Sequence, residues 1–180
     1  GRVGHCQAIK ALMKKYIIVT GGAGFVGSNL IEYLLLKTNK KILSIDNYSS
    51  GIKKNHIVSP RLKYIKANTK DICKVLSKYK SQIISLFHFG EFSRIFQSFN
   101  KFDECLESNT IGTYATFKFC LDNKIKLIYS ATSASLGNNG EDKNLSPYAF
   151  TKAKNLELLN NLKNWFNFKF EIIYFYNVYG

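Results

Sequence analysis

The chain has 180 residues, of which 46% are hydrophobic and 21% are charged. This composition is typical of a folded domain and excludes a disordered tail or a collagen-like chain. The formal net charge of +14 would suit a polyanionic partner. Because nearly all of the basic residues are lysines spread along the chain, we interpret the charge as solvated surface and expect no specific nucleic acid partner.

Short β-rich runs alternate with helical patterns, which is typical of βαβ units around a parallel sheet. Strands are predicted at residues 16–20, 41–45, 62–67, 83–88, 125–130 and 170–176. Helices are predicted at residues 25–37, 72–79, 101–122 and 147–165, and the last has Ser146 as its N-cap and Pro147 at its first position. This pattern predicts an α/β fold with one doubly wound parallel sheet in the order 3-2-1-4-5-6.

The N-terminal region does not resemble a targeting segment. Residues 1–12 precede the single methionine, and we interpret them as an extension of one domain over residues 13–180. The apolar stretch that follows contains four glycines, an asparagine and a glutamate, which argues against a signal peptide or a membrane span. The four cysteines lack metal-ligand spacing, so we expect reduced thiols, no metal site and a cytoplasmic location.

A glycine-rich loop joins the first predicted strand to the first helix. Gly21 precedes the sequence Gly22-Ala23-Gly24-Phe25-Val26-Gly27, whose glycines allow a tight turn and the close approach of a pyrophosphate to the helix N-terminus. Asp46 ends the second strand, where a carboxylate accepts the ribose hydroxyls of a dinucleotide. It would repel a 2′-phosphate, which favours NAD, although Lys53 and Lys54 nearby leave NADP open.

A tyrosine four residues before a lysine on a helix is a candidate base, but the spacing alone does not choose the pair. It occurs three times: at Tyr33/Lys37, Tyr114/Lys118 and Tyr148/Lys152. We favour Tyr148 because it follows the fifth strand, which ends in a hydroxyl-rich run at residues 130–135, and ligands bind beyond the carboxyl ends of such strands. Tyr148 and Lys152 share a helix face, and a nearby ammonium favours the phenolate, so Tyr148 is the expected base. Thr132 would bond the reacting oxygen, and Lys152 would also hold the nicotinamide ribose.

Seven segments together resemble the NAD-dependent nucleotide-sugar epimerase/dehydratase family of extended short-chain dehydrogenases/reductases, in particular UDP-glucose 4-epimerase-like proteins. They are TGGAGFVGSN (20–29), IDN (45–47), FHFGE (87–91), SNTIGT (108–113), IYSATSASLG (128–137), SPYAFTKAK (146–154) and YFYNVYG (174–180). They occur in the family's order over residues 14–180. The resemblance implies a Rossmann fold, NAD as the cofactor and a nucleotide sugar as the substrate.

The resemblance also implies a role for each matching residue. The implied cofactor-binding residues are Gly21, Gly24, Phe25, Val26, Gly27, Asp46, Asn47, Asn68, Thr69, Phe89, Gly90, Glu91, Asn109, Tyr148 and Lys152. Of these, Asn68 and Thr69 replace the Asp-Ile that the family usually has near the adenine. Thr132, Tyr148 and Lys152 are the implied catalytic residues, and the implied substrate-binding residues are Thr132, Ser133 and Asn177.

The sequence indicates the type of reaction less narrowly than it indicates the family. Ser133 and Ala134 replace the Asp-Glu pair of the 4,6-dehydratases, which favours an epimerase, with UDP-hexose 4-epimerases first. A dehydratase, a heptose 6-epimerase and a non-catalytic dinucleotide-binding fragment remain alternatives. The resemblance further implies a C-terminal substrate domain that this sequence lacks, and a homodimer formed through helices near residues 95–122 and 147–165. Apolar residues on those helices would serve an intramolecular core equally well.

Overall fold

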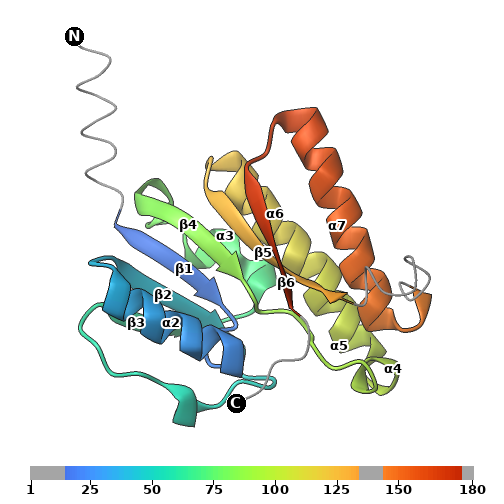
Figure 1. Ribbon diagram of the computed structural model, residues 1–180, viewed down its shortest axis with the longest axis horizontal. Helices are drawn as coiled ribbons and strands as arrows, with labels where there is room; N and C mark the ends of the chain where they lie inside the picture. The colour runs from blue at the N-terminus through green and yellow to red at the C-terminus, as the bar shows by residue number, and fades with distance from the viewer. Residues whose placement is uncertain (1–14, 134–143, 176–180) are drawn as a thin grey trace.

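Six parallel strands form one sheet in the order β3-β2-β1-β4-β5-β6, which confirms the predicted topology (Figure 1). The computed structural model describes residues 15–133 and 144–175. The strands are β1 (Tyr16–Thr20), β2 (Lys41–Asp46), β3 (Leu62–Lys66), β4 (Ile83–His88), β5 (Lys126–Thr132) and β6 (Phe170–Phe175). Because all neighbouring strands pair in parallel, their carboxyl ends lie at one edge of the sheet.

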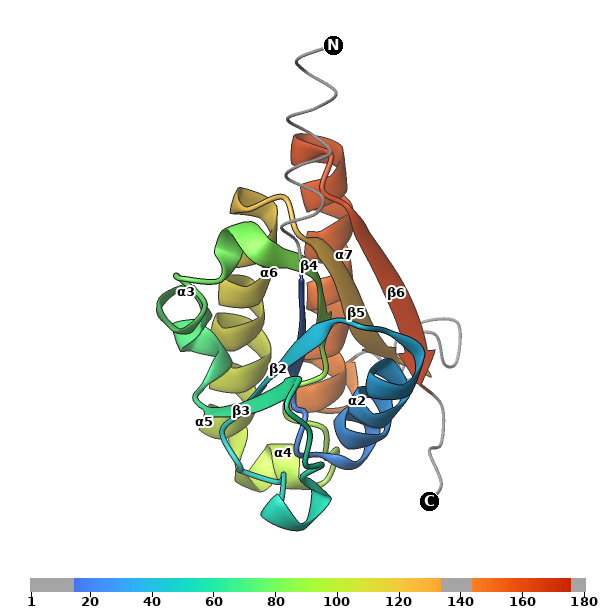
Figure 2. The same cartoon turned by 90° about the vertical axis from the view of Figure 1, so that its left-hand side faces the viewer.

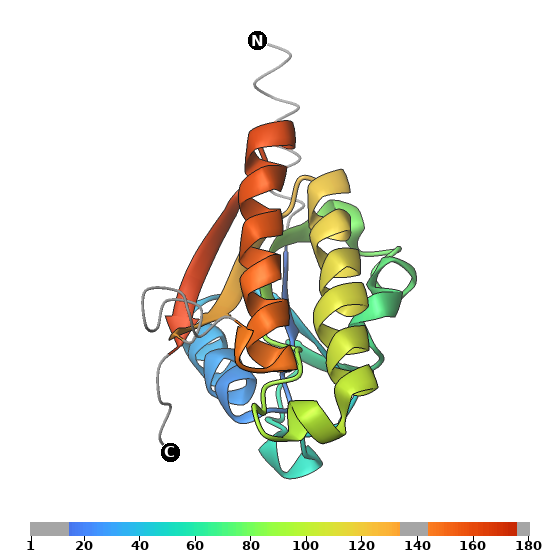
Figure 3. The same cartoon turned by 90° about the vertical axis from the view of Figure 1, so that its right-hand side faces the viewer.

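Helices cover both faces of the sheet. They are α2 (Phe25–Lys37), α3 (Ile72–Val75), α4 (Gln97–Asn100), α5 (Phe102–Leu106), α6 (Thr113–Asp122) and α7 (Pro147–Phe166). Helix α2 packs Ile31 and Leu34 against Ile17 and Val19 on one face. Helices α3, α6 and α7 cover the opposite face, where α6 and α7 lie side by side (Figures 2 and 3).

Two predicted helices differ from the observed ones. Helix α3 ends at Val75 instead of Tyr79, because the chain turns after the fully buried Leu76 and brings the Tyr79 ring edge-on to Tyr16, with ring centroids 5.0 Å apart. The helix predicted over residues 101–122 is divided by a π-helical turn, Glu107–Gly112, between α5 and α6. Such turns are frequent at functional sites, and this one faces the carboxyl ends of the strands.

The start of α7 follows the sequence prediction closely. The Ser146 hydroxyl accepts a hydrogen bond from the N–H of Ala149 at 3.0 Å, and Pro147 occupies the first turn. This cap fixes the register of the helix, which sets the direction of the side chains one turn later. Within the part of the chain that the structure describes, no helix has both the length and the apolar character needed to cross a membrane.

Candidate active site

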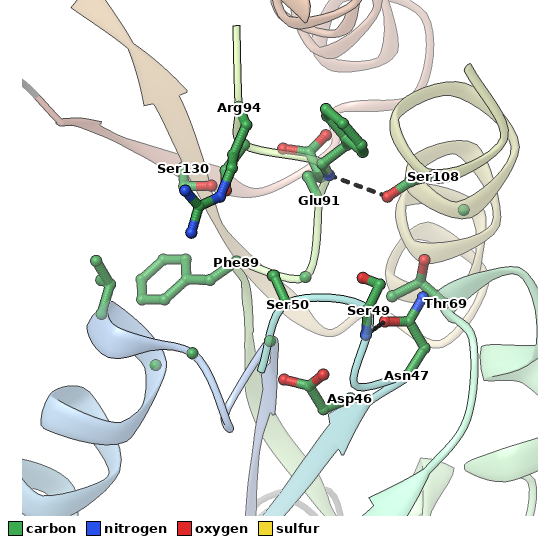
Figure 4. A pocket seen from close by; sticks show the side chains of 18 of the residues that line it. Asp46, Asn47, Ser49, Ser50, Thr69, Phe89, Glu91, Arg94, Ser108 and Ser130 are labelled. Carbon is green, nitrogen blue, oxygen red and sulfur yellow. Dashed lines mark hydrogen bonds between the residues drawn. The ribbon is translucent and has the colours of Figure 1, made fainter. Parts of the chain in front are cut away.

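A cavity of about 780 Å³ opens at the carboxyl ends of the strands (Figure 4). Its walls come from the loop between β1 and α2, the ends of β2, β4 and β5, the π-helical turn and the first two turns of α7. A volume of this size is typical of a site for a small molecule or a cofactor. The topology therefore brings together residues as far apart in the sequence as Gly21 and Phe175.

The glycine loop forms one wall of the cavity and leaves the N-terminus of α2 open. Gly21 has a φ of 73°, which disfavours a residue with a side chain. A Cβ on Gly27 would lie 2.8 Å from Gly21 C and Gly22 Cα, so backbone packing excludes a larger residue there. No side chain caps α2 and its first turn holds no acidic residue, so its first N–H groups are available to an anion.

Asp46 ties the end of β2 to this loop. Its side chain accepts hydrogen bonds from the N–H of Ala23 at 2.9 Å and from the N–H of Tyr48 at 2.8 Å, one on each carboxylate oxygen. A carboxylate has about four acceptor positions. Two positions therefore remain for the hydroxyls of a ribose, and the carboxylate is held rigidly at the cavity wall.

The adjoining wall is built by Asn47, Asn68 and Thr69. The Asn47 amide donates to Asn68 Oδ1 at 3.0 Å, which bridges the ends of β2 and β3. A Cβ on Gly112 would overlap Thr69 Oγ1, so the π-helical turn approaches this wall as closely as glycine allows. All three polar residues line the cavity, as expected for residues near an adenosine.

The segment after β4 crosses the middle of the cavity. The Phe89 ring lies at the cavity wall near the glycine loop and stands edge-on to Phe175, with ring centroids 5.5 Å apart (Figure 4). The N–H of Gly90 donates to Thr20 Oγ1 at 2.9 Å, which ties this segment to the end of β1. Arg94, which the sequence interpretation missed, points into the cavity near Ser130. Among the described residues it has no acidic partner within ion-pair distance, so it adds positive charge to the cavity.

The expected catalytic residues Thr132, Tyr148 and Lys152 all line this cavity. Ser133 does not, and Asn177 lies outside the described residues. Asn109 is fully buried behind the wall, where its amide donates to the Phe92 carbonyl at 3.1 Å and accepts from the Phe92 N–H at 2.7 Å. In this position Asn109 holds the segment after β4 in place and does not line the cavity.

Lys152 has a partner that the sequence interpretation did not foresee. Its ammonium forms an ion pair with Glu91 and donates to the carbonyl and hydroxyl oxygens of Ser130. The side chains of Lys152 and Glu91 are only 5% and 3% exposed. Glu91 appeared in the sequence as part of a cofactor-facing segment, but no local signal paired it with a lysine 61 residues later.

Next to this pair lies His88, at the end of β4. The pKa of His88 is lowered to about 4, mainly because the ring is buried; Glu91 opposes this lowering and the Lys152 charge adds to it. The ring is therefore neutral near pH 7 and bonds Thr20 Oγ1 at 2.8 Å and Thr113 Oγ1 at 3.0 Å. It links the end of the glycine-loop strand to helix α6.

The residues present fit a dinucleotide cofactor. The open helix N-terminus at Phe25 and Val26 fits a pyrophosphate, and the free acceptor positions of Asp46 fit a ribose. At Gly27 the backbone of the glycine loop approaches so closely that no side chain would fit. Over the described ranges, no group of three or more His, Cys, Asp or Glu side chains is arranged to hold a metal ion.

Comparison with known proteins finds epimerases among the similar chains. A relative from Brachyspira hyodysenteriae, ADP-L-glycero-D-manno-heptose-6-epimerase, is 33% identical over 91% of this chain and 55% of its own length. UDP-N-acetylglucosamine 4-epimerase from Methanobrevibacter ruminantium, solved with UDP-N-acetylmuramic acid, is 27% identical with a TM-score of 0.80, over 93% of this chain and 56% of that one. The Bordetella bronchiseptica enzyme WbmF, solved with NAD⁺, is 26% identical with a TM-score of 0.81, over 93% of this chain and 51% of that one.

The chain thus spans about half the length of these relatives. Residues 17–180 match the NAD dependent epimerase/dehydratase family, and this range includes every residue that lines the cavity. The expected fold, family and cofactor class are therefore confirmed. The chain belongs to the NAD-dependent epimerase/dehydratase family.

Proposed function

We propose that this chain is the NAD-binding, catalytic part of a nucleotide-sugar epimerase, with UDP-hexose 4-epimerisation as the first reaction to test. The observation that supports this most directly is the position of Thr132, Tyr148 and Lys152 in one cavity with the glycine loop and Asp46. A cofactor held by the loop and by Asp46 would extend along the strand ends toward these three residues. A binding domain without catalysis would not need all three in that wall.

In the proposed reaction, NAD held by the glycine loop and Asp46 would supply reversible hydride transfer at one sugar carbon, so that the hydride lost from one face of the carbon would return to the other. Tyr148, at the start of α7, accepts the proton of the hydroxyl on that carbon. Thr132, at the end of β5, hydrogen-bonds the same oxygen and orients it. Lys152, one turn after Tyr148, supplies positive charge at the same wall of the cavity and would hold the ribose of the cofactor.

The type of nucleotide sugar is the finer part of the proposal. The heptose 6-epimerase relative is 33% identical to this chain and the UDP-N-acetylglucosamine 4-epimerase 27% identical. In sequence, the loop after β5 and the C-terminal segment resemble both classes of enzyme. Both reactions place a base and a hydroxyl-orienting residue at the reacting carbon. An ADP-heptose is therefore the second substrate to test.

The decisive experiment compares two tyrosines with the same spacing to a lysine. The protein in its natural full length is incubated with NAD and UDP-glucose, UDP-N-acetylglucosamine or an ADP-heptose, and epimer formation is followed by NMR. Tyr148→Phe should reduce turnover by at least about a hundredfold while NAD affinity stays nearly unchanged. Tyr114→Phe is the matched control, because Tyr114 is 56% exposed on α6 and does not line the cavity. Full activity in Tyr148→Phe would refute the assignment of the base.

We also propose a homodimer formed through α4, α5 and α7. An apolar groove there is lined by residues of α5 and of the α7 start, including Phe102, Leu106 and Phe150. Phe99 also lines this groove and is 55% exposed, and Trp165, near the C-terminal end of α7, is 62% exposed. Two copies that pair these helices would cover apolar side chains that a monomer leaves in water.

The free thiols of Cys73, Cys105 and Cys120 fit the proposed cytoplasmic location.

A further inference from the structure

The Lys152 ammonium is held inside the protein by a buried carboxylate. Lys152 is 4% exposed, and its Nζ contacts Glu91 Oε2, the Ser130 carbonyl and the face of the Tyr129 ring, 4.7 Å from the centroid. The Glu91 side chain is 3% exposed. A buried charge is costly unless it is paired, so each member of this pair depends on the other.

Glu91 is also anchored by three groups other than Lys152. Its Oε1 accepts hydrogen bonds from the hydroxyl of Thr113 at 2.6 Å, the hydroxyl of Tyr129 at 3.1 Å and the amide of Asn155 at 3.1 Å. These donors lie on α6, β5 and α7, so three separate elements anchor one carboxylate. With Lys152, Glu91 accepts four hydrogen bonds, three at Oε1 and one at Oε2.

Counting donors gives the direction of the hydrogen bonds that lead to Glu91. Thr20 Oγ1 accepts from the N–H groups of Phe89 and Gly90, so its own proton goes to Nδ1 of the His88 ring. Nε2 of that ring then carries the hydrogen and donates to Thr113 Oγ1. The Thr113 hydroxyl is thereby free to donate to Glu91. This chain of hydrogen bonds runs from Thr20, at the end of β1, to the carboxylate of Glu91, which binds Lys152.

We propose that Glu91 is a positioning residue of this site, whose anchored carboxylate holds the Lys152 ammonium at the end of β5 and balances its charge. In this role Glu91 acts through Lys152. Its contribution to turnover rests on the proposed epimerase function. Its effect on Lys152 does not, and is measurable in the cofactor-free protein.

The first test is the reactivity of Lys152 toward acetic anhydride at pH 8 in the cofactor-free full-length protein. Only the neutral amine reacts, and Lys152 lines the cavity, which gives the reagent access. Peptide mass spectrometry measures the acetylation of Lys152 relative to that of Lys154, which lies two residues later on the same helix and has a side chain that is 58% exposed. Glu91→Gln keeps the size of the side chain but removes its charge, so the buried ammonium loses its compensation. We expect the ratio of Lys152 to Lys154 acetylation to rise at least about tenfold.

The matched control is Glu171→Gln, which removes the partner of Lys126 in an exposed ion pair on β5 and β6. It should leave the Lys152 ratio unchanged. An unchanged ratio in Glu91→Gln as well would overturn the proposal. If Glu91→Gln does not fold, Thr113→Val keeps the charge but removes one anchoring bond, and should raise the ratio in the same direction by a smaller factor.

The second test is the pH profile of kcat with the sugar nucleotide that the wild type accepts. Glu91→Gln should lower kcat, leave the KM for the sugar nucleotide nearly unchanged and move the alkaline limb to lower pH. Glu91→Asp should restore part of the loss, because it returns the charge. If kcat of Glu91→Gln fell by the same factor at every pH and the alkaline limb stayed at the wild-type pH, Glu91 would have a merely structural role. If the wild type lacks turnover, the proposed function fails, while the acetylation ratio still decides the role of Glu91.

Discussion

Acidification from pH 7 to pH 4.5 should destabilise this protein through His88. The ring is fully buried, and burial lowers its pKa to about 4 from an ordinary value near 6.5. Glu91 and Lys152 are the charged groups that face it and have opposite effects on the pKa. Its two nitrogens bond Thr20 and Thr113, and a second ring proton would leave the Thr20 hydroxyl without its acceptor.

The sign and size of the effect follow from proton linkage. Between pH 6.5 and pH 4 the unfolded chain binds a proton at His88 that the folded chain does not, so the free energy of unfolding rises with pH in this range. The stabilisation by the neutral ring is complete above pH 6.5 and is lost as the pH falls through 4. From pH 7 to pH 4.5 the loss is about 2–3 kcal/mol, an appreciable fraction of the stability of a typical domain.

Urea unfolding followed by circular dichroism at several pH values tests this. The free energy of unfolding of the wild type should fall more steeply than that of His88→Gln, which cannot titrate, by about 2–3 kcal/mol between pH 7 and pH 4.5. Thr116→Val is the control, because it removes a buried hydroxyl bonded to the Gly112 carbonyl without removing a titrating group. It should lower stability equally at every pH. A constant difference between wild type and His88→Gln would refute the reasoning.

Four further variants test the cofactor wall and the dimer. Gly27→Ala should cost at least about 2 kcal/mol in urea unfolding, because its Cβ meets the backbone of Gly21, and should abolish NAD binding measured by calorimetry. In Gly24→Ala the added Cβ would have only the Gly21 carbonyl oxygen nearby, at 3.3 Å, so this variant should fold with about normal stability. It should bind NAD more weakly, because the added methyl group stands in the cavity. Equal losses of stability in Gly27→Ala and Gly24→Ala would contradict this distinction between backbone packing and cavity space. Asp46→Asn should reduce the ratio of NAD affinity to NADP affinity by about tenfold or more in the same assay. An unchanged ratio would contradict the view that the Asp46 carboxylate repels the 2′-phosphate of NADP. Phe102→Glu should shift sedimentation toward the monomer, whereas unaltered association would exclude this surface.

The cofactor loop and the strand order could be predicted from the sequence because their signals are local. Gly27 and Asp46 lie at defined distances from strands whose apolar pattern is continuous, and the short crossovers between strands allow few topologies. Context also separated Tyr148 from two other tyrosines with the same spacing. The structure places Tyr148 in the cavity, whereas Tyr33 and Tyr114 are 58% and 56% exposed.

The surroundings of Lys152 were decided only by the tertiary structure. Glu91 is 61 residues away from Lys152, and its other partners lie on α6, β5 and α7, so no sequence period brings them together. The neutral state of His88 likewise depends on burial beneath helices that are distant in sequence. A glycine turn, a cap or a strand is determined over a few neighbouring residues. The compensation of a buried charge depends on which chain segments exclude water from it, and that is a property of the packed fold.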